Sequence, residues 1–189
     1  MLLENKVSFI TGSAQGIGKE IAVTFAREGS SVVICDVNKD ALDETARQLR
    51  AFNVEVLAEV VDVTALKQVQ DFVNKILDKL GKVDILINNA GITRDALIVR
   101  MKESDWDTVL AVNLKGAFNC IKATAAAMMK QRSGKIVNIA SDIIKIPSAH
   151  GMLAYACSKA AVYTLTQCLA RALGPSGINV NAIAPGYVA

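Results

Sequence analysis

The sequence predicts an α/β fold: a doubly wound parallel sheet with helices on both faces, in three layers. Three observations support this prediction. Short β-branched, apolar runs alternate with longer segments of helical periodicity along all 189 residues. A glycine-rich stretch over residues 12–18 separates the first apolar run from the first helical segment. Hydrophobic residues make up 52% of the chain and charged residues 21%, which is typical of a globular protein with a sizeable core.

The first part of the chain is predicted to form three strands separated by two helices. An apolar run over 6–11 that ends at a glycine is typical of a buried strand. Apolar side chains then recur with the helical period over 17–28, up to a glycine at position 29. The remaining elements follow the same two patterns, with strands over 31–35 and 54–61 and an amphipathic helix over 39–52.

The second part continues the alternation. Helical periodicity predicts a helix over 65–80 that a glycine closes, and a helical segment over 102–130 that bends near Gly116. The helix over 153–173 ends at a Gly-Pro pair, because proline cannot continue a helix. Strands are expected over residues 83–87, 135–140 and 178–183. All six strands would join one parallel sheet through right-handed crossovers.

Composition and charge argue against several classes of function. The net charge is only +3, and basic residues are interspersed with acidic ones, so we expect no nucleic-acid surface. The longest apolar run is far too short to span a membrane, and the N-terminus has no signal-peptide pattern. His150 is the only histidine, which argues against His-based triads and His-rich metal sites. The four cysteines lack C-x-x-C spacing; we expect Cys35, Cys120, Cys157 and Cys168 to be reduced core residues of a cytoplasmic protein.

The glycine-rich stretch T-G-S-A-Q-G-I-G is predicted to bind the phosphates of a dinucleotide, as in Rossmann-type folds. Gly12 allows the tight turn off the strand, Gly16 lets the backbone approach a pyrophosphate, and Gly18 allows close packing of helix and strand. The loop would deliver phosphate to the positive end of a helix. An ordinary glycine-rich turn is the alternative. The expected cofactor contacts here are Gly12, Ser13, Gln15, Gly16, Ile17 and Gly18.

Asp36 is the candidate that selects the cofactor. It ends the second strand, 18 positions after Gly18, where an acidic group binds a ribose 2′-hydroxyl. A carboxylate there repels a 2′-phosphate, and the positions that would attract one, Gln15 and Val37, are neutral. The sequence therefore favours NAD(H), with NADP(H) as the alternative. Asp36 could instead serve as a turn residue or a helix N-cap.

Two further strand ends carry candidate cofactor contacts, because open α/β sheets bind ligands at the carboxyl ends of their strands. Asp62 could accept a hydrogen bond from the adenine amino group, with the Val63 backbone completing the contact. Asn89, Ala90 and Gly91 could pass beneath the adenosine ribose. For the asparagine pair before Ala90, a simple strand-ending turn is the alternative.

The candidate chemical group is a Tyr–Lys pair on the helix over 153–173. Tyr155 and Lys159 are four positions apart and therefore share one helix face. An ammonium beside a phenol stabilises the phenolate, so the pair could transfer protons. A surface Tyr and Lys without function is the alternative. Ser141 follows the fifth strand and Asn113 falls mid-helix, where a kink with a captured water would explain an asparagine.

Together these motifs resemble the short-chain dehydrogenase/reductase family. The glycine-rich stretch, N-N-A-G, Asn113, Ser141 and Y-A-C-S-K occur in order, and the resemblance runs from about residue 4 to the end. Residues 89–95 and 101–118 are most similar to the 3-oxoacyl-(acyl-carrier-protein) reductase branch. The resemblance implies one dinucleotide-binding and catalytic domain over 1–189. Because family members usually continue with a substrate lid and a seventh strand, we expect the chain to be truncated.

The resemblance also implies roles for individual residues. Tyr155 would be the acid/base, and Lys159 would stabilise its phenolate and bind the nicotinamide ribose. Ser141 would orient and polarise the substrate oxygen, and Asn113 would hold a water that links Lys159 to solvent. The cofactor contacts implied in the same way are Tyr155, Lys159, Pro185, Gly186 and Val188.

The implied activity is hydride transfer between NAD(H) and a secondary alcohol or ketone. A 3-oxoacyl or 3-hydroxyacyl thioester of fatty acid metabolism is the first choice, and a sugar, polyol or cyclic alcohol is the alternative. A non-catalytic nucleotide-binding regulatory or scaffold protein is the alternative of another class. An acyl carrier protein is a candidate partner: Arg132 matches one basic residue of that approach surface, whereas Ser176 replaces another. Helices 102–130 and 153–173 carry apolar residues on more than one face, which favours a homodimer or homotetramer over simple burial.

Overall fold

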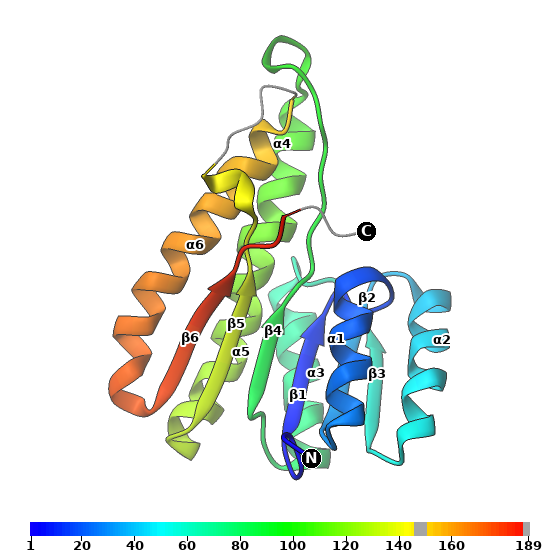
Figure 1. The fold of residues 1–189 in the computed structure, drawn as a ribbon. Coiled ribbons are helices and arrows are strands. Elements are labelled where there is room, and N and C mark those ends of the chain that lie inside the picture. Colours follow the sequence, from blue (N-terminus) through cyan, green and yellow to red (C-terminus); the bar gives the residue numbers. More distant parts are fainter. Residues whose placement is uncertain (146–150, 187–189) are drawn as a thin grey trace.

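The computed structural model describes residues 1–145 and 151–186, and within them six strands form one sheet (Figure 1). All the strand pairs are parallel, and the order is β3-β2-β1-β4-β5-β6. The strands are β1 (Val7–Thr11), β2 (Ser31–Asp36), β3 (Val56–Val60), β4 (Ile85–Asn88), β5 (Gly134–Ile139) and β6 (Ile178–Ile183). The predicted six-stranded parallel sheet is confirmed.

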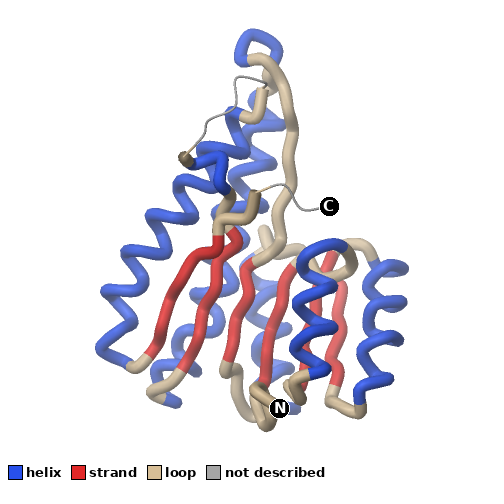
Figure 2. Tube along the Cα trace, viewed as in Figure 1, coloured by secondary structure: helices blue, strands red, loops and turns tan. Residues whose placement is uncertain are grey.

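Helices cover both faces of the sheet (Figure 2). The main helices are α1 (Gly16–Arg27), α2 (Lys39–Leu49), α3 (Leu66–Leu80), α4 (Glu103–Leu110), α5 (Gly116–Gln131) and α6 (Leu153–Leu173). Short 3₁₀ turns are η1 (Arg50–Phe52), η2 (Ile98–Arg100), η4 (Asp142–Ile144) and η5 (Gly174–Ser176). Helices α1 and α2 pack on one face, whereas α3, α5 and α6 contribute to the core on the other.

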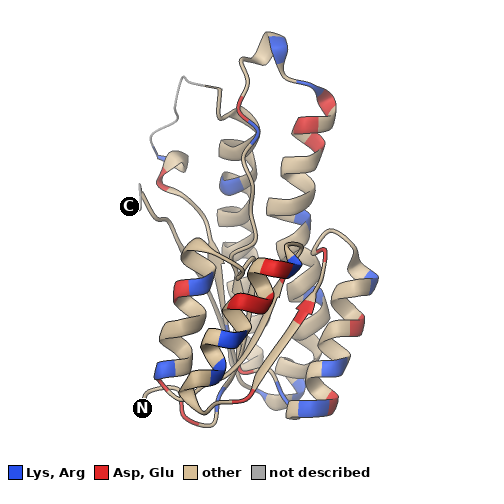
Figure 3. Ribbon diagram, turned by 90° about the vertical axis from the view of Figure 1, so that its right-hand side faces the viewer, with Lys and Arg blue, Asp and Glu red and all other residues tan. Residues whose placement is uncertain are grey.

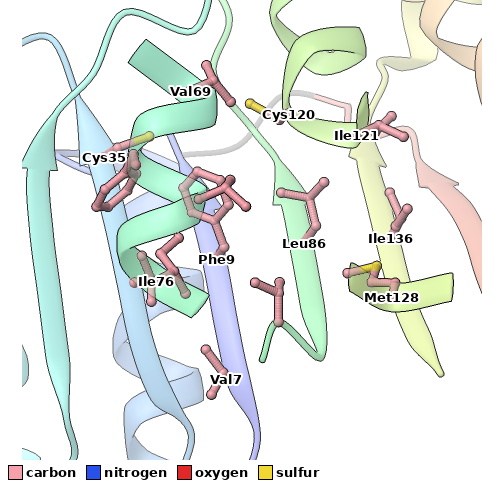
Figure 4. Close-up of a cluster of buried hydrophobic side chains, with 14 of the residues drawn as sticks. Val7, Phe9, Cys35, Val69, Ile76, Leu86, Cys120, Ile121, Met128 and Ile136 are labelled. Atoms are coloured by element: carbon pink, nitrogen blue, oxygen red, sulfur yellow. The ribbon is translucent and has the colours of Figure 1, made fainter. Parts of the chain in front are cut away.

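Two hydrophobic cores hold the layers together, one on each face of the sheet. On the α3–α5 side, the rings of Phe9 and Phe72 meet edge to face with centroids 5.5 Å apart. Phe9 and Leu86 of this core are labelled in Figure 4. Met128 of α5 and Ile136 of β5 extend the same core. Because both faces are covered, central strands are buried along their whole length and do not alternate with exposed residues, as all five residues of β1 illustrate.

A π-helical turn, η3 (Ala111–Lys115), lies between α4 and α5, within the helical segment in which the sequence predicts a bend. Asn113 is buried at its centre. A π turn widens the helix by one residue and is frequent at functional sites. The π turn ends just before Gly116, where glycine allows the Val63 side chain to approach α5 closely.

The strand order reverses direction at β1, which pairs with β2 on one side and with β4 on the other. In doubly wound sheets a crevice forms outside the strand ends at such a point. The β4–α4 connection and the N-terminal part of α6 rise above these carboxyl ends in Figure 1, and residues of both, such as Ile92 and Tyr155, line a cavity there.

The expectation that all four cysteines are buried is wrong for two of them. Cys35 and Cys120 are buried, but Cys157 and Cys168 are exposed on α6. Helix α6 is apolar around most of its circumference, so periodicity alone could not tell which face meets the sheet.

Among the charged residues of the part that the structure describes, only Lys159 is buried. In Figure 3, Lys and Arg are interspersed with Asp and Glu along the helices. Among residues 1–145 and 151–186, no helix combines the length and hydrophobicity that crossing a membrane requires.

Candidate active site

A cavity of about 670 Å³ opens at the carboxyl ends of the strands, beside the point where the strand order reverses. This volume lies within the range of about 300–1,000 Å³ that is typical of small-molecule sites. The walls come from the β1–α1 loop, the ends of β2, β3 and β4, the π turn η3, and α6. Within the described residues, no group of three or more His, Cys, Asp or Glu side chains could hold a metal ion.

The glycine-rich loop lies at the N-terminus of α1. Its N-cap residue, Gln15, is extended, and its side chain makes no capping hydrogen bond. The first N–H groups of α1 therefore lack a side-chain acceptor, and together with the positive end of the helix they suit a phosphate. Gly16 has φ +55°, and a Cβ there would meet no atom within 4 Å, so this position is open on the cavity side.

The other two glycines of the loop serve packing. A Cβ on Gly12, which has φ +62°, would lie 2.6 Å from Cα of Ala90. A Cβ on Gly18 would lie 2.3 Å from the carbonyl oxygen of Gly12. These two positions thus require glycine for the close approach of the loop to β4 and α1, as the sequence predicts for Gly18.

Hydrogen bonds from β2 and α2 hold the loop in place. The N–H of Ala14 donates to Asp36 Oδ2 (3.1 Å), and the buried Thr45 hydroxyl donates to the Ala14 carbonyl (2.9 Å). The hydroxyl of Ser13 donates to the carbonyls of Ile10 and Cys35. Ser13, which the sequence predicts as a cofactor contact, is fully buried and does not line the cavity.

Asp36 lines the cavity at the end of β2. Its Oδ1 accepts from the N–H of Asn38 (3.0 Å), while its Oδ2 accepts from Ala14. The alternative that Asp36 caps a helix is wrong, because the N-cap of α2 is Asn38, whose side chain accepts from Ala41 N–H (3.2 Å). Each carboxylate oxygen has two lone pairs, so Asp36 keeps acceptor capacity toward the cavity.

The segment after β4 is tied directly to β1. The Thr11 hydroxyl accepts from the N–H groups of Asn89 and Ala90, each at 3.1 Å. The Asn89 amide nitrogen donates to the carbonyls of Thr11 (3.0 Å) and Gly12 (2.8 Å). Residues 89–91 thus form a fixed floor of the cavity next to the glycine-rich loop.

Tyr155 and Lys159 also line the cavity, one turn apart on α6. The Lys159 Nζ lies 5.6 Å from the centroid of the Tyr155 ring and donates to the Ile139 carbonyl at 2.5 Å. Lys159 is only 4% exposed, and this burial lowers the pKa of its ammonium from 10.5 to about 8. A Cβ added to Gly91 would lie 3.5 Å from Lys159 Nζ, so the ammonium lies against the cavity floor.

Asn113 lies behind that floor, buried and outside the cavity lining. Its Oδ1 accepts from Ile92 N–H (2.8 Å), and its Nδ2 donates to the Ile92 carbonyl (3.1 Å) and to the Ser158 hydroxyl (2.9 Å). The Ser158 hydroxyl in turn donates to the Tyr155 carbonyl (2.7 Å). The π turn is thereby connected to both the β4–α4 loop and α6.

Ser141 lies two residues beyond the carbonyl that Lys159 contacts. Its hydroxyl is 3.4 Å from Asp142 Oδ1 and accepts from Ile143 N–H, also at 3.4 Å. Ser141 is buried and does not line the cavity as the structure describes it.

Comparison with known proteins identifies the family. Residues 6–189 match the short chain dehydrogenase family. The chain belongs to this family. It is accordingly an oxidoreductase that uses a nicotinamide nucleotide and acts on small molecules, and the uncapped start of α1 beside the open Gly16 fits the phosphates of such a cofactor.

Individual members are similar over nearly the whole chain. It is 46% identical over 188 residues to 3-oxoacyl-[acyl-carrier-protein] reductase FabG of Thermotoga maritima, covering 100% of this chain and 76% of that protein. It is 39% identical to (2S)-[(R)-hydroxy(phenyl)methyl]succinyl-CoA dehydrogenase subunit BbsD of Thauera aromatica, with 100% and 75% coverage. The structure of NAD⁺-bound xylitol dehydrogenase superposes with a TM-score of 0.95 at 36% identity, covering 99% of this chain and 72% of that one.

Most of the residues predicted as the short-chain dehydrogenase site lie together in the cavity wall. Those that line it are Gly12, Gln15, Gly16, Ile17, Asp36, Asp62, Val63, Asn89, Ala90, Gly91, Tyr155 and Lys159. Those outside the lining are Ser13, Gly18, Asn113, Ser141, Pro185 and Gly186. Pro185 and Gly186 lie against Asp142, whose N–H donates to the Pro185 carbonyl (3.1 Å). Val188 lies outside the described residues.

Sequence reasoning missed several cavity residues of this short-chain dehydrogenase. These are Cys35, Asn38, Val61, Ile92, Thr93, Val112 and Ile139. Most of them are direct neighbours of the predicted strand-end residues, so their position beside a motif was the available signal. Val112, on the π turn, likewise adjoins the predicted site residue Asn113.

Proposed function

We propose that residues 1–189 act as a single dinucleotide-binding and catalytic domain that transfers a hydride between NAD(H) and a secondary alcohol or ketone. The observation that carries this proposal is the buried Lys159 ammonium beside the Tyr155 ring in the cavity wall. A buried cation favours the phenolate form of a neighbouring tyrosine. Tyr155 Oη would give its proton to the carbonyl oxygen in reduction and take it back in oxidation.

Two residues near the pair would assist it. The Ser141 hydroxyl would orient the substrate oxygen toward Tyr155, since Ser141 follows the strand end that Lys159 contacts. Asn113 would hold a water near Lys159; a Cβ on Gly91 would lie 3.3 Å from Asn113 Oδ1 and 3.5 Å from Lys159 Nζ. When bound, the nicotinamide nucleotide supplies or accepts the hydride.

The remaining site residues would hold that nucleotide. The start of α1 would take the pyrophosphate, with Asp62 and Val63 at the adenine and residues 89–91 beneath the ribose. Asp36 favours NAD(H) over NADP(H), because its carboxylate would repel a 2′-phosphate. Lys39, the nearest cation in the sequence, is exposed and already paired with Asp43. Pro185, Gly186 and Val188 would lie beside the nicotinamide.

A 3-oxoacyl or 3-hydroxyacyl thioester is the proposed substrate, supported by the 46% identity to a 3-oxoacyl-[acyl-carrier-protein] reductase. A sugar or polyol is the second candidate, supported by the 36% identity to xylitol dehydrogenase.

An acyl carrier protein would approach near Arg132, whose guanidinium is 3.5 Å from the Pro175 carbonyl. Exposed apolar residues on α5 and α6, including Phe118, Met129 and Tyr163, favour a homodimer or homotetramer, which light scattering would test. Four free cysteines favour a reducing compartment such as the cytoplasm.

The test is to follow NADH absorbance with a panel of 3-oxoacyl thioesters, sugars, polyols and cyclic ketones and alcohols. We expect turnover with a 3-oxoacyl thioester, and we expect Tyr155→Phe to lose it by at least about 10³-fold while NADH still binds. Tyr163→Phe is the matched control, because Tyr163 is exposed two turns further along α6. Wild-type activity in Tyr155→Phe would refute the role of the pair, and no turnover with any panel member would favour a non-catalytic nucleotide-binding protein.

The cofactor preference has its own test. We expect the KM for NADH to be lower than that for NADPH, and we expect Asp36→Ser to narrow the difference. Thr45→Val is the control, because it removes the hydrogen bond to the Ala14 carbonyl without changing the residue at the ribose position. This variant should raise the KM for NADH and the KM for NADPH by the same factor. A wild-type preference for NADPH would rule out the role proposed for Asp36.

A further inference from the structure

Asn119 is a buried polar residue that none of the proposed catalytic steps uses. It lies in the first turn of α5 and is only 1% exposed. Asparagine is a poor residue for a helix, and burying a primary amide costs free energy unless its donors are paired. An asparagine at this position therefore needs a partner outside its own helix.

The partners of Asn119 are in the loop after β3. Its Nδ2 donates to the carbonyl oxygens of Val63 (2.8 Å) and Thr64 (3.1 Å). Both partners are carbonyls, which only accept, so the amide nitrogen must face the loop. One side chain of α5 thus holds two consecutive peptide groups of the β3–α3 connection.

A second contact between the same two segments is steric. A Cβ on Gly116, one turn before Asn119, would lie 2.6 Å from Val63 Cγ2. Because residue 116 is a glycine, the Val63 side chain can contact the helix backbone. The Asn119 amide hydrogen-bonds the carbonyls of Val63 and Thr64. The position of Val63 is therefore set by α5 at both its side chain and its backbone.

The effect extends to Asp62 through one peptide group. The N–H of Thr64 donates to Asp62 Oδ1 (2.8 Å), and the Val63 carbonyl, which belongs to the same peptide group, accepts from Asn119. Asp62 and Val63 both line the cavity, whereas Asn119 does not. Loss of the Asn119 amide would free the Val63–Thr64 peptide, and the Asp62 carboxylate would lose its fixed direction.

We infer that Asn119 is a positioning residue for the adenine end of the cofactor site, acting through Val63, Thr64 and Asp62. This assignment rests on the proposed function, since it presupposes an adenine nucleotide in the cavity. Asn113, on the π turn of the same continuous helical segment, holds Ile92, which also lines the cavity. The helical segment over 113–119 therefore carries two asparagine side chains that each fix a backbone segment of the cavity.

The test separates the two halves of the cofactor. Isothermal titration would measure binding of ADP-ribose, reduced nicotinamide mononucleotide and NADH to the wild-type chain and to Asn119→Leu. We expect Asn119→Leu to raise the dissociation constants of ADP-ribose and NADH by about tenfold. The dissociation constant of the mononucleotide should stay within about twofold of the wild-type value. In turnover, KM for NADH should rise by the same factor, with kcat at saturating NADH within about twofold of the wild type.

Thr124→Val is the matched control. Thr124 is fully buried on the same helix, but its hydroxyl donates only to the α5 carbonyls of Cys120 and Ile121. This variant should lower thermal stability without changing any of the three dissociation constants. If Asn119→Leu does not fold, Asn119→Ser carries the same comparison, because serine is too short to reach both carbonyls.

An unchanged dissociation constant for ADP-ribose in a folded Asn119 variant would overturn the inference. Equal weakening of ADP-ribose and the mononucleotide would also overturn it, because it would indicate a general loosening of the cleft. A wild-type chain that binds neither ADP-ribose nor NADH would instead refute the proposed function, and with it this role of Asn119.

Discussion

The Lys159 ammonium lies 5.6 Å from the centre of the Tyr155 ring, one turn along α6, and only 4% of Lys159 is exposed. The cation beside the candidate acid/base is therefore nearly removed from water. Burial favours the neutral amine and lowers the Lys159 pKa to about 8. The same burial that makes the cation effective on its neighbour thus makes it costly to the fold.

This cost should appear in the pH dependence of stability. Between pH 8 and 10.5 the unfolded chain, with an ordinary lysine pKa, binds more protons than the folded chain. The Lys159 contribution to the free energy of unfolding therefore rises with pH across this window, and its full cost is present below pH 8. Relative to Lys159→Met, the wild type should gain up to about 3 kcal/mol between pH 7.5 and 10.5 in urea denaturation. A difference between the two proteins that does not change with pH would contradict this.

Asn113 should matter more to stability than its hydrogen-bond partner on α6. Asn113→Ala removes three hydrogen bonds at once and leaves both polar groups of Ile92 unpaired, which we expect to cost about 3 kcal/mol. Ser158→Ala removes only one of these and should cost about 1 kcal/mol. Urea denaturation of both variants measures the difference. Equal costs would mean that the clamp on Ile92 contributes nothing.

Gly16 and Gly81 provide a matched pair for the phosphate site. Both have positive φ, +55° and +76°, and neither would bring a Cβ within 4 Å of another atom. Alanine at either position should cost about 1 kcal/mol of backbone strain. Only Gly16→Ala should also weaken the binding of NADH, by about tenfold or more, because its methyl group would lie where the pyrophosphate approaches the loop. The same NADH affinity in both variants would exclude the loop as the phosphate site.

The cysteines should divide into two classes toward a thiol reagent. Cys157 and Cys168 are exposed and should be labelled in the native protein. Burial raises the pKa of both internal thiols, that of Cys120 to about 12, so Cys35 and Cys120 should react only after unfolding. Mass spectrometry of labelled peptides distinguishes the four sites. Labelling of Cys120 under native conditions would mean that the α3–α5 core opens.

Much of the fold followed from local pattern. Strand β3, expected over 54–61, spans Val56–Val60, and helix α3, expected over 65–80, spans Leu66–Leu80. Such agreement arises because apolar spacing records which side of a segment is buried. The same reasoning failed for Cys157 and Cys168, since α6 is apolar on more than one side and its spacing does not single out a face.

The candidate site could be predicted only where function concentrates residues in motifs. The glycine-rich loop and the Tyr155–Lys159 pair are local in sequence, and their members line the cavity. Asn119 could not be found in this way, because its partner Val63 is 56 positions distant and only the folded chain brings the two together. The π turn was anticipated as a bend, but its position around Asn113 depends on the contact of that side chain with Ile92.

The order of the strands also bears on how the chain acquires its structure during synthesis. Strands β1, β2 and β3 can pair with one another as soon as they emerge from the ribosome, but the other neighbour of β1 is β4, and Ser8 pairs with Ile85. Until residue 85 is available, the backbone of β1 presents an open hydrogen-bonding edge with Phe9 and Ile10 beside it. Parallel pairing between such distant segments is slow, and unpaired apolar edges promote aggregation. Nascent chains that stall after β3 should therefore be the species that most need a chaperone.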